Sequence, residues 1–243
     1  MKLSRFLLFG LFWGAVGLSS SCELLKDGPC LEGKGRSKTE ERSMANFTGV
    51  DLRISGTVHI TQGPEYTVQV ETYGNLLSEI ETSVEGSSLV IKSANCLDYS
   101  QESTNIYVTM PSLESVELKS SGEIQVNSVP ADKDLRLNLS GSGKIKYTGA
   151  AKKLLLLHSG SGNIELSGTA ETLETTLSGS GKILGFGLLA ETSRTTLTGS
   201  GEQQVWVTNY LEANITGSGN IYYRGTPSIS IYKSGSGDLF ASN

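Results

Sequence analysis

The segment Leu139-Ser-Gly-Ser-Gly-Lys-Ile145 decides the fold, because five similar segments follow it at almost constant spacing. Successive copies start 18 to 20 residues apart, and a degenerate copy, Lys119-Ser-Ser-Gly-Glu-Ile124, precedes the first. A fixed period of this length is typical of structural units that stack on their neighbours. We expect each copy to form a tight corner, and the corner glycines are Gly141, Gly143, Gly160, Gly162, Gly179, Gly181, Gly199, Gly201, Gly217, Gly219, Gly235 and Gly237.

Hydrophobic and polar side chains alternate on both sides of each corner. Leu135, Leu137 and Leu139 alternate with polar residues before the first complete copy, and Ile145 and Tyr147 do so after it. A period of two indicates strands with one buried face. Each repeat therefore predicts a strand, a glycine-rich corner, a second strand and a looser return.

One such unit cannot bury its own hydrophobic face, but stacked units can. The pattern predicts an all-β fold, a right-handed parallel β-helix with about 19 residues per coil and an irregular β layer on the N-terminal side. Neighbouring coils should lie about 4.8 Å apart. We expect Ile145, Ile164, Ile183 and Ile221 to stack inside. Glycine should be needed at the corners for positive φ and for close stacking.

The repeats give a domain organisation in three parts. Residues 46–243 form the β-helix domain, with an irregular first part at 46–115 and regular coils at 116–243. Alternation at 50–60, 66–71, 89–92 and 106–110 indicates strands in the first part, and residues 53–58 are a candidate early copy of the corner. A separate small β domain is the alternative for this part. Residues 22–45 are polar and predict a flexible tether.

The N-terminus has the features of a signal peptide, which we place at residues 1–21. Lys2 and Arg5 precede an apolar run at 6–18 that is short for a membrane span. The run ends in Leu18-Ser-Ser-Ser-Cys22, which resembles a bacterial lipobox, although Leu18 is one position further from the cysteine than usual. This predicts lipid attachment at Cys22 and anchoring to the outer membrane, on its periplasmic or surface face. An ordinary secreted protein is the alternative.

Two cysteines remain if Cys22 is acylated. An envelope compartment permits disulfides, so we predict a bridge between Cys30 and Cys96. Two free thiols are the alternative.

Charge and composition exclude one class of partner. The net charge is −5 and no Lys/Arg run is present, so we expect no nucleic-acid binding.

The search for a metal or cofactor site is negative. The residue after the second corner glycine is cationic in Lys144 and Lys182, so the corners lack the recurring carboxylates of a calcium array. His59 and His158 have no histidine partner at ligand spacing. His158 replaces a leucine of the repeat, and we interpret it as a structural variant at a half-exposed corner. We expect no cofactor and no metal.

Catalytic residues are not indicated either. The corner serines recur in similar copies, which favours a structural role over nucleophilic catalysis. Glu165, Glu174, Glu202 and Glu212 alternate with apolar residues and predict a solvated sheet face.

Aromatic residues gather in the last coils. Trp206, Tyr210, Tyr222 and Tyr232 are a candidate contact patch for a glycan or a protein. The alternative is that half of the aromatic residues there pack inside, and Tyr223 has an inward register. Few residues follow the last corner at Gly237, so we expect the last coil to be uncovered and to expose Leu239 and Phe240. The protein should then self-associate weakly through this end.

The chain resembles a known family. Phe47-Thr-Gly-Val50, Asn75-Leu-Leu77, Val108-Thr-Met-Pro-Ser-Leu-Glu-Ser115 and the serial corners are similar to the head-GIN domain family of auto-transporter adhesins, common among Bacteroidetes lipoproteins. The resemblance implies a β-helix in the cell envelope and supplies no catalytic residues.

These observations favour a non-enzymatic envelope lipoprotein that acts as an adhesion or interaction module for an unknown protein or glycan. A carbohydrate-active β-helix enzyme or a glycan-binding protein is the alternative.

Overall fold

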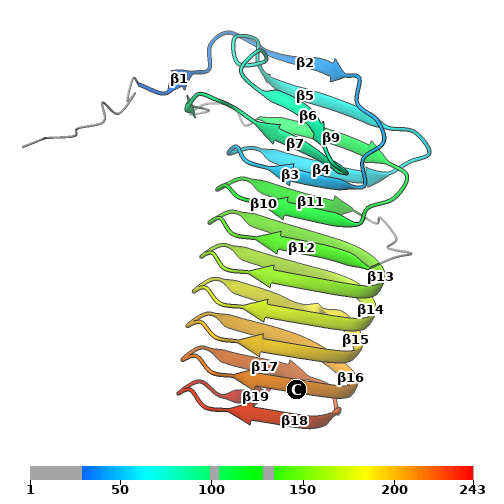
Figure 1. Cartoon of the computed structure of the whole chain (residues 1–243), viewed down its shortest axis with the longest axis vertical. Coiled ribbons are helices and arrows are strands. Elements are labelled where there is room, and N and C mark those ends of the chain that lie inside the picture. Colours follow the sequence, from blue (N-terminus) through cyan, green and yellow to red (C-terminus); the bar gives the residue numbers. More distant parts are fainter. Residues whose placement is uncertain (1–28, 99–103, 128–133, 243) are drawn as a thin grey trace, which may run out of the picture.

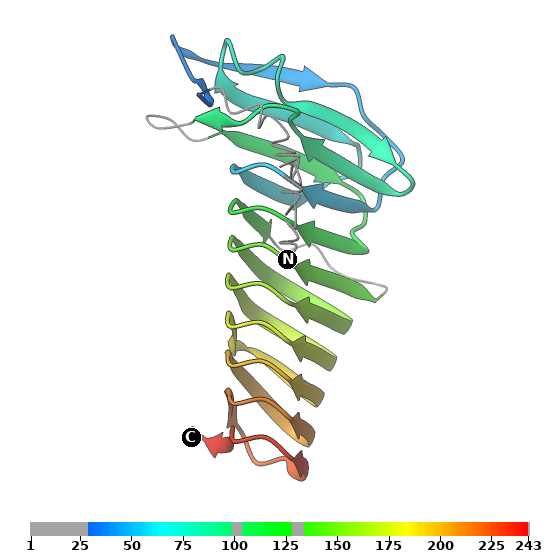
Figure 2. The same cartoon turned by 60° about the vertical axis from the view of Figure 1, so that its left-hand side comes forward.

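The computed structural model describes residues 29–98, 104–127 and 134–242, and every regular element in these ranges is a β-strand (Figure 1). Within the same ranges, no helix has the length and hydropathy needed to cross a membrane. The strands wind into a parallel β-solenoid, as the repeats predict (Figures 1 and 2).

Two faces of stacked strands enclose the core, and we call them face A and face B. The long strands β13 to β16 bend through the return, so that each gives its first half to face A and its second half to face B. Face A runs through β2 (Ser37–Arg42), β5 (Thr67–Tyr73), β9 (Asn105–Met110), β4 (Thr57–Gln62), β11 (Glu123–Asn127), β13 (Lys144–His158), β14 (Asn163–Leu177), β15 (Lys182–Leu197), β16 (Glu202–Ile215), β17 (Asn220–Arg224) and β19 (Leu239–Ala241).

Face B faces it across the core. It runs through β6 (Glu81–Glu85), β7 (Ser88–Lys92), β3 (Gly49–Leu52), β10 (Ser115–Leu118) and β12 (Leu135–Leu139), then through the second halves of β13 to β16, and ends with β18 (Ser228–Lys233). The glycine-rich corners join the two faces along one edge and the returns join them along the other (Figure 1).

The predicted isoleucine column is confirmed. Ile145, Ile164 and Ile183 pair in register from coil to coil, and Gln203 then precedes Ile221 in the same column. Gln203 is fully buried, and its side chain accepts a hydrogen bond from the Thr175 hydroxyl and donates one to the Thr196 carbonyl. These two bonds explain how a polar residue is accommodated in an apolar column.

The irregular first part shares both faces and the hydrophobic core with the regular coils. Its layers do not follow chain order, because the β3–β4 layer lies between the β7–β9 layer and the β10–β11 layer. Residues 53–58 do form an early corner: the hydroxyls of Ser55 and Ser121 are 2.6 Å apart, and Glu123 N–H donates to the Gly56 carbonyl at 2.8 Å. After β2, which lies outermost, the chain enters an inner layer with β3 and β4, runs outward to β5, and then returns to β10 and β11.

The N-terminal end of the solenoid is closed by antiparallel strands. β5 pairs antiparallel with β9, β2 pairs antiparallel with β5, and β6 pairs antiparallel with β7. Residues 37–42, which the sequence analysis places in the tether, form β2, because this segment extends the edge of face A.

The corner glycines are required for a different reason than expected. The predicted positive φ is wrong at the corners: the positive-φ glycines of the described ranges are Gly35, Gly86, Gly168 and Gly225. Successive corners instead lie backbone on backbone. A Cβ on Gly179 would overlap the carbonyl oxygen of Gly160 and lie 2.6 Å from that of Ser159. The close approach of the coils alone therefore excludes a side chain.

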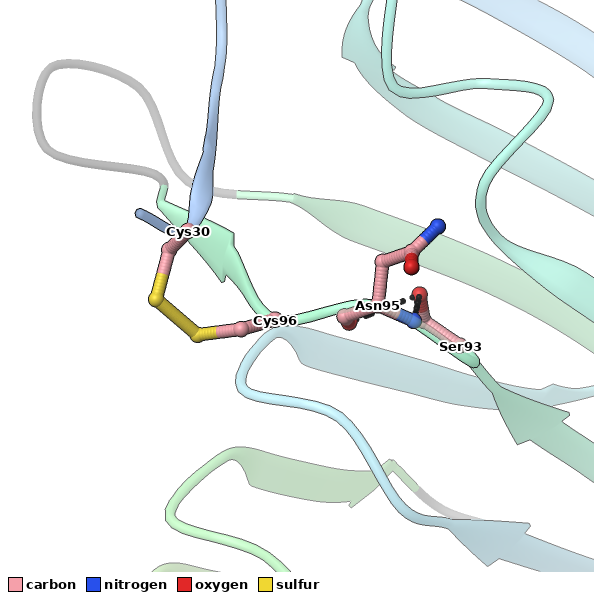
Figure 3. The surroundings of a disulfide bond; sticks show 4 residues. All are labelled: Cys30, Ser93, Asn95 and Cys96. Carbon is pink, nitrogen blue, oxygen red and sulfur yellow. Dashed lines mark hydrogen bonds between the residues drawn. A yellow bond between two sulfur atoms is a disulfide. The ribbon is translucent and has the colours of Figure 1, made fainter. Parts of the chain in front are cut away.

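A disulfide joins Cys30 to Cys96, the pair expected from the sequence, with the two Cα atoms 4.7 Å apart (Figure 3). Beside it, β1 (Leu31–Glu32) pairs with β8 (Leu97–Asp98), and Asn95 N–H donates to the Ser93 hydroxyl at 3.1 Å. The bridge holds the N-terminal arm against the segment that follows β7. The predicted signal peptide and lipid-bearing Cys22 lie outside the described residues.

Candidate functional site

Ion pairs cover the outer sheet surface of the regular coils. Each of the four glutamates considered above has a basic partner on a neighbouring coil. The pairs are Lys144–Glu165 at 3.1 Å, Lys153–Glu174 at 3.2 Å, Lys182–Glu202 at 3.3 Å and Arg194–Glu212 at 3.1 Å. Exposed ion pairs of this kind contribute little to stability, and here they form a solvated sheet surface.

His158 lies in the core and not at a half-exposed corner, so that expectation is wrong. Its side chain points into the core between the two faces, and the residue is in register with Leu139 and Leu177. The ring nitrogens lie 3.1 Å from the Leu139 carbonyl and 2.7 Å from the Gly162 carbonyl. His158 therefore fills a leucine position.

No metal site is present among the described residues, since no group of three or more His, Cys, Asp or Glu side chains could hold an ion there. His59, the second histidine, stacks on the ring of Tyr107 at 5.1 Å on face A.

The aromatic residues of the candidate contact patch are divided between surfaces. Trp206 and Tyr222 belong to face A, where Tyr222 stacks on Phe240 with ring centroids 5.5 Å apart. Tyr232 points outward from face B, and Tyr210 lies beside the return. The structure therefore gives Tyr222 a partner in Phe240, which the proposed patch had omitted.

Tyr223 has the inward register expected from the sequence, because it pairs with Val205. On the outside of face A, the guanidinium of Arg224 covers the ring of Phe186 at 4.2 Å. Part of the aromatic surface in these coils is therefore already occupied by the chain itself.

The C-terminal end of the solenoid exposes core positions. Ile229 and Ile231 continue the inward columns of Leu211 and Ala213. Leu211 and Ala213 are 0% and 1% exposed, whereas Ile229 and Ile231 are 40% and 48% exposed. No described residue covers the two isoleucines on their outer side. We call the surface made by β18 and β19 the open end, and Figures 1 and 2 show these two strands at the C-terminal end of the solenoid.

The open end also carries unpaired strand edges. Among the described strands, β18 pairs with β16 alone and β19 with β17 alone, so each has one free edge of backbone N–H and C=O groups. Such edges are templates for pairing with another strand. The ionic groups nearby are satisfied internally: Lys233 pairs with Asp238 at 2.8 Å and, by its hydrogen bond, lowers the pKa of that carboxyl. The surface that remains consists of apolar side chains and of free backbone N–H and C=O groups.

The opposite end is protected. Four of the six residues of β2, the edge strand of face A, are charged: Lys38, Glu40, Glu41 and Arg42. Charged side chains on an edge strand disfavour pairing with another sheet. The two ends of the solenoid thus differ in chemistry, and the open end is the candidate functional site.

Comparison with known proteins agrees with this architecture. A family model described as "Putative auto-transporter adhesin, head GIN domain" matches residues 46–227. A putative adhesin from Bacteroides fragilis superposes with a TM-score of 0.81 at 23% identity, covering 87% of this chain and 100% of the other. A putative adhesin from Parabacteroides merdae does so with a TM-score of 0.63 at 21% identity, covering 88% and 99%.

A third similar structure has a different name. It is a putative lipid binding protein from Parabacteroides distasonis, with a TM-score of 0.71 at 25% identity, covering 88% of this chain and 99% of the other. A search of curated proteins found no match.

Proposed function

Because this chain belongs to the family "Putative auto-transporter adhesin, head GIN domain", we propose that it is a lipid-anchored outer-membrane adhesion module that binds its partner through the open end. The exposed core positions at Ile229 and Ile231 carry this proposal. Isolated exposed apolar residues are ordinary, but exposed core columns beside free strand edges mark an interaction surface.

The solenoid separates the proposed anchor from the open end. β1, the first described strand, lies beside the β2 end of the solenoid, and β18 and β19 lie at the other end (Figure 1). Eleven strands stack along face A at about 4.8 Å each, which gives a rigid spacer of about 50 Å. A lipid on Cys22 would place the open end at the membrane-distal tip.

The adhesion assay uses cells that produce the full chain. These cells should cluster, or attach to glycan-coated or protein-coated surfaces, more than cells with an empty vector. Ile231→Lys should abolish the gain because it places a charge on the open end. Leu157→Lys is the matched control, since Leu157 is 46% exposed on the outer surface of a central coil. Clustering and attachment equal to the empty vector, with the protein detected on the cells, would refute the proposed function.

The anchor has its own test. Cys22→Ala should remove incorporation of radioactive fatty acid and release the protein from the membrane fraction, because the thiol is the proposed acceptor. Equal labelling of the variant and the parent would contradict the lipoprotein assignment.

A further inference from the structure

We infer that the partner of the open end is the open end of a second copy of this chain, joined tail to tail. This inference rests on the proposed function and names the occupant of the same site. It explains two features together, the exposed core positions and the free strand edges.

The chemistry of the two ends favours this occupant. A partner for Ile229 and Ile231 must offer apolar side chains at the spacing of one more coil. The open end of a second copy presents the same isoleucines together with Leu239, which continues the inward column of Ile221. The β2 end presents a charged edge strand instead. Lys38 and Glu40 stand in register with the buried Thr72 and Val70, so head-to-tail stacking would put their charges into the same core layer as the uncovered isoleucines. Burying unpaired charge against apolar surface is costly.

The strand directions also fit a two-fold dimer. Two copies that meet tail to tail are related by a two-fold axis perpendicular to the solenoid axis. If the axis is normal to the faces, β18 meets β18 of the second copy with reversed direction. If the axis runs along the strands, β18 meets β19 of the second copy, which runs the opposite way because the chain turns at the corner between them. Both arrangements give antiparallel pairs, which can satisfy the free edges.

The contact area between two open ends is small. The area of one coil end is well below the roughly 1,200–2,000 Å² that a stable interface buries, so a single pair of molecules should bind weakly. Many anchored copies on two facing membranes would act together by avidity. Because the anchors would lie at the far ends, tail-to-tail pairing joins opposed membranes at a separation of about 100 Å, twice the spacer length. The inferred activity is therefore homophilic cell–cell adhesion.

A mixed-population assay tests the inference. Producing cells with one fluorescent label are mixed with non-producing cells carrying another. Homophilic pairing predicts clusters that contain producing cells only, and their loss with Ile231→Lys but not with Leu157→Lys. Clusters that include non-producing cells in proportion would overturn the inference while leaving the adhesion function intact. The absence of any clustering or surface attachment would reject both.

A solution measurement separates pairing from folding. The full chain in detergent should show a concentration-dependent dimer in sedimentation experiments, and Ile231→Lys should weaken the dimer at least about tenfold because each copy then buries an unpaired charge. The circular dichroism spectrum and melting temperature of the dilute variant should match the parent, since Ile231 is already half exposed. A strict monomer at high concentration, or a dimer that Ile231→Lys leaves unchanged, would overturn the inference.

Discussion

Replacing Gly179 by alanine tests how the coils stack. The added Cβ would overlap the carbonyl oxygen of Gly160 on the preceding coil and lie 2.6 Å from that of Ser159. Both obstacles are backbone atoms, so no side chain can rotate away to make room. The corner of Gly179 cannot retreat either, because the corner of Gly199 lies against its other side.

The expected cost follows from this double confinement. Over-packed sites in proteins usually lose about 1–3 kcal/mol, and a backbone clash with no free volume belongs at the upper end. We expect Gly179→Ala to lower the free energy of unfolding by about 3 kcal/mol. For a chain of this size, each kcal/mol lowers the melting temperature by roughly 2–4 °C, so the shift should be about 6–12 °C.

The last coil supplies the matched comparison. A Cβ on Gly235 would also overlap the preceding corner and lie 2.6 Å from the carbonyl oxygen of Thr216. No described coil lies beyond Gly235, so this corner can move outward, and Gly235→Ala should cost about 1 kcal/mol, at the low end of the range. Ser180→Ala, at an exposed corner position, should change stability by less than about 0.5 kcal/mol.

Thermal melts of the three variants at low protein concentration test whether backbone stacking at the corners excludes a side chain. Equal melting temperatures for Gly179→Ala and the parent would refute the stacking argument. Equal losses at Gly179 and Gly235 would show that confinement by the following coil is not the cause.

Three further predictions concern two buried side chains and the disulfide. His158→Leu should leave the melting temperature within a few degrees of the parent, because Leu177 occupies the equivalent position on the next coil and both carbonyls beside the ring also accept backbone N–H groups; a loss above about 2 kcal/mol would contradict this. Tyr147→Phe should stabilise the fold by about 1 kcal/mol, because the buried hydroxyl has no hydrogen-bond partner among the described residues. Burial raises the pKa of Tyr147 to about 12. Between the ordinary tyrosine pKa of about 10 and that value, the unfolded chain releases a proton that the folded chain retains, so stability should fall as pH rises. Denaturant titrations at pH 9 and 11 should show a smaller loss for Tyr147→Phe, and an equal loss would argue against this role. Replacing Cys30 and Cys96 by serine should cost about 2–4 kcal/mol, since the bridge closes a loop between residues 66 positions apart; an unchanged denaturation midpoint would show that the bridge adds no stability.

The local sequence pattern predicted much of the fold. The regular corner spacing set the coil length, and the alternation around Ile145 and Ile164 assigned residues to the inside or the outside. Both signals are readable because stacked neighbours are a fixed number of residues apart. The same regularity placed Tyr223 in an inward register.

Other features have no periodic signal. The β3–β4 layer pairs with β10 and β11, about 66 residues later in the chain, and with β7 and β9 on its other side. The burial of His158 depends on the coil above and the coil below, which admit an imidazole in a leucine column. The separation of Tyr232 from Tyr222 depends on which face each strand joins.

The sequence by itself determined that this chain is a β-solenoid, since a repeat that cannot bury its own apolar face must stack on copies of itself. Only the tertiary structure decided how the strands of the first part close the N-terminal end and which core positions the last described coil exposes. The N-terminal end is closed by antiparallel strands and a charged edge, whereas at the open end Ile229 and Ile231 stand in core columns without a covering coil. The physical reason is that burial depends on the layer above a residue as well as on the residue, and the sequence of one strand does not specify that layer.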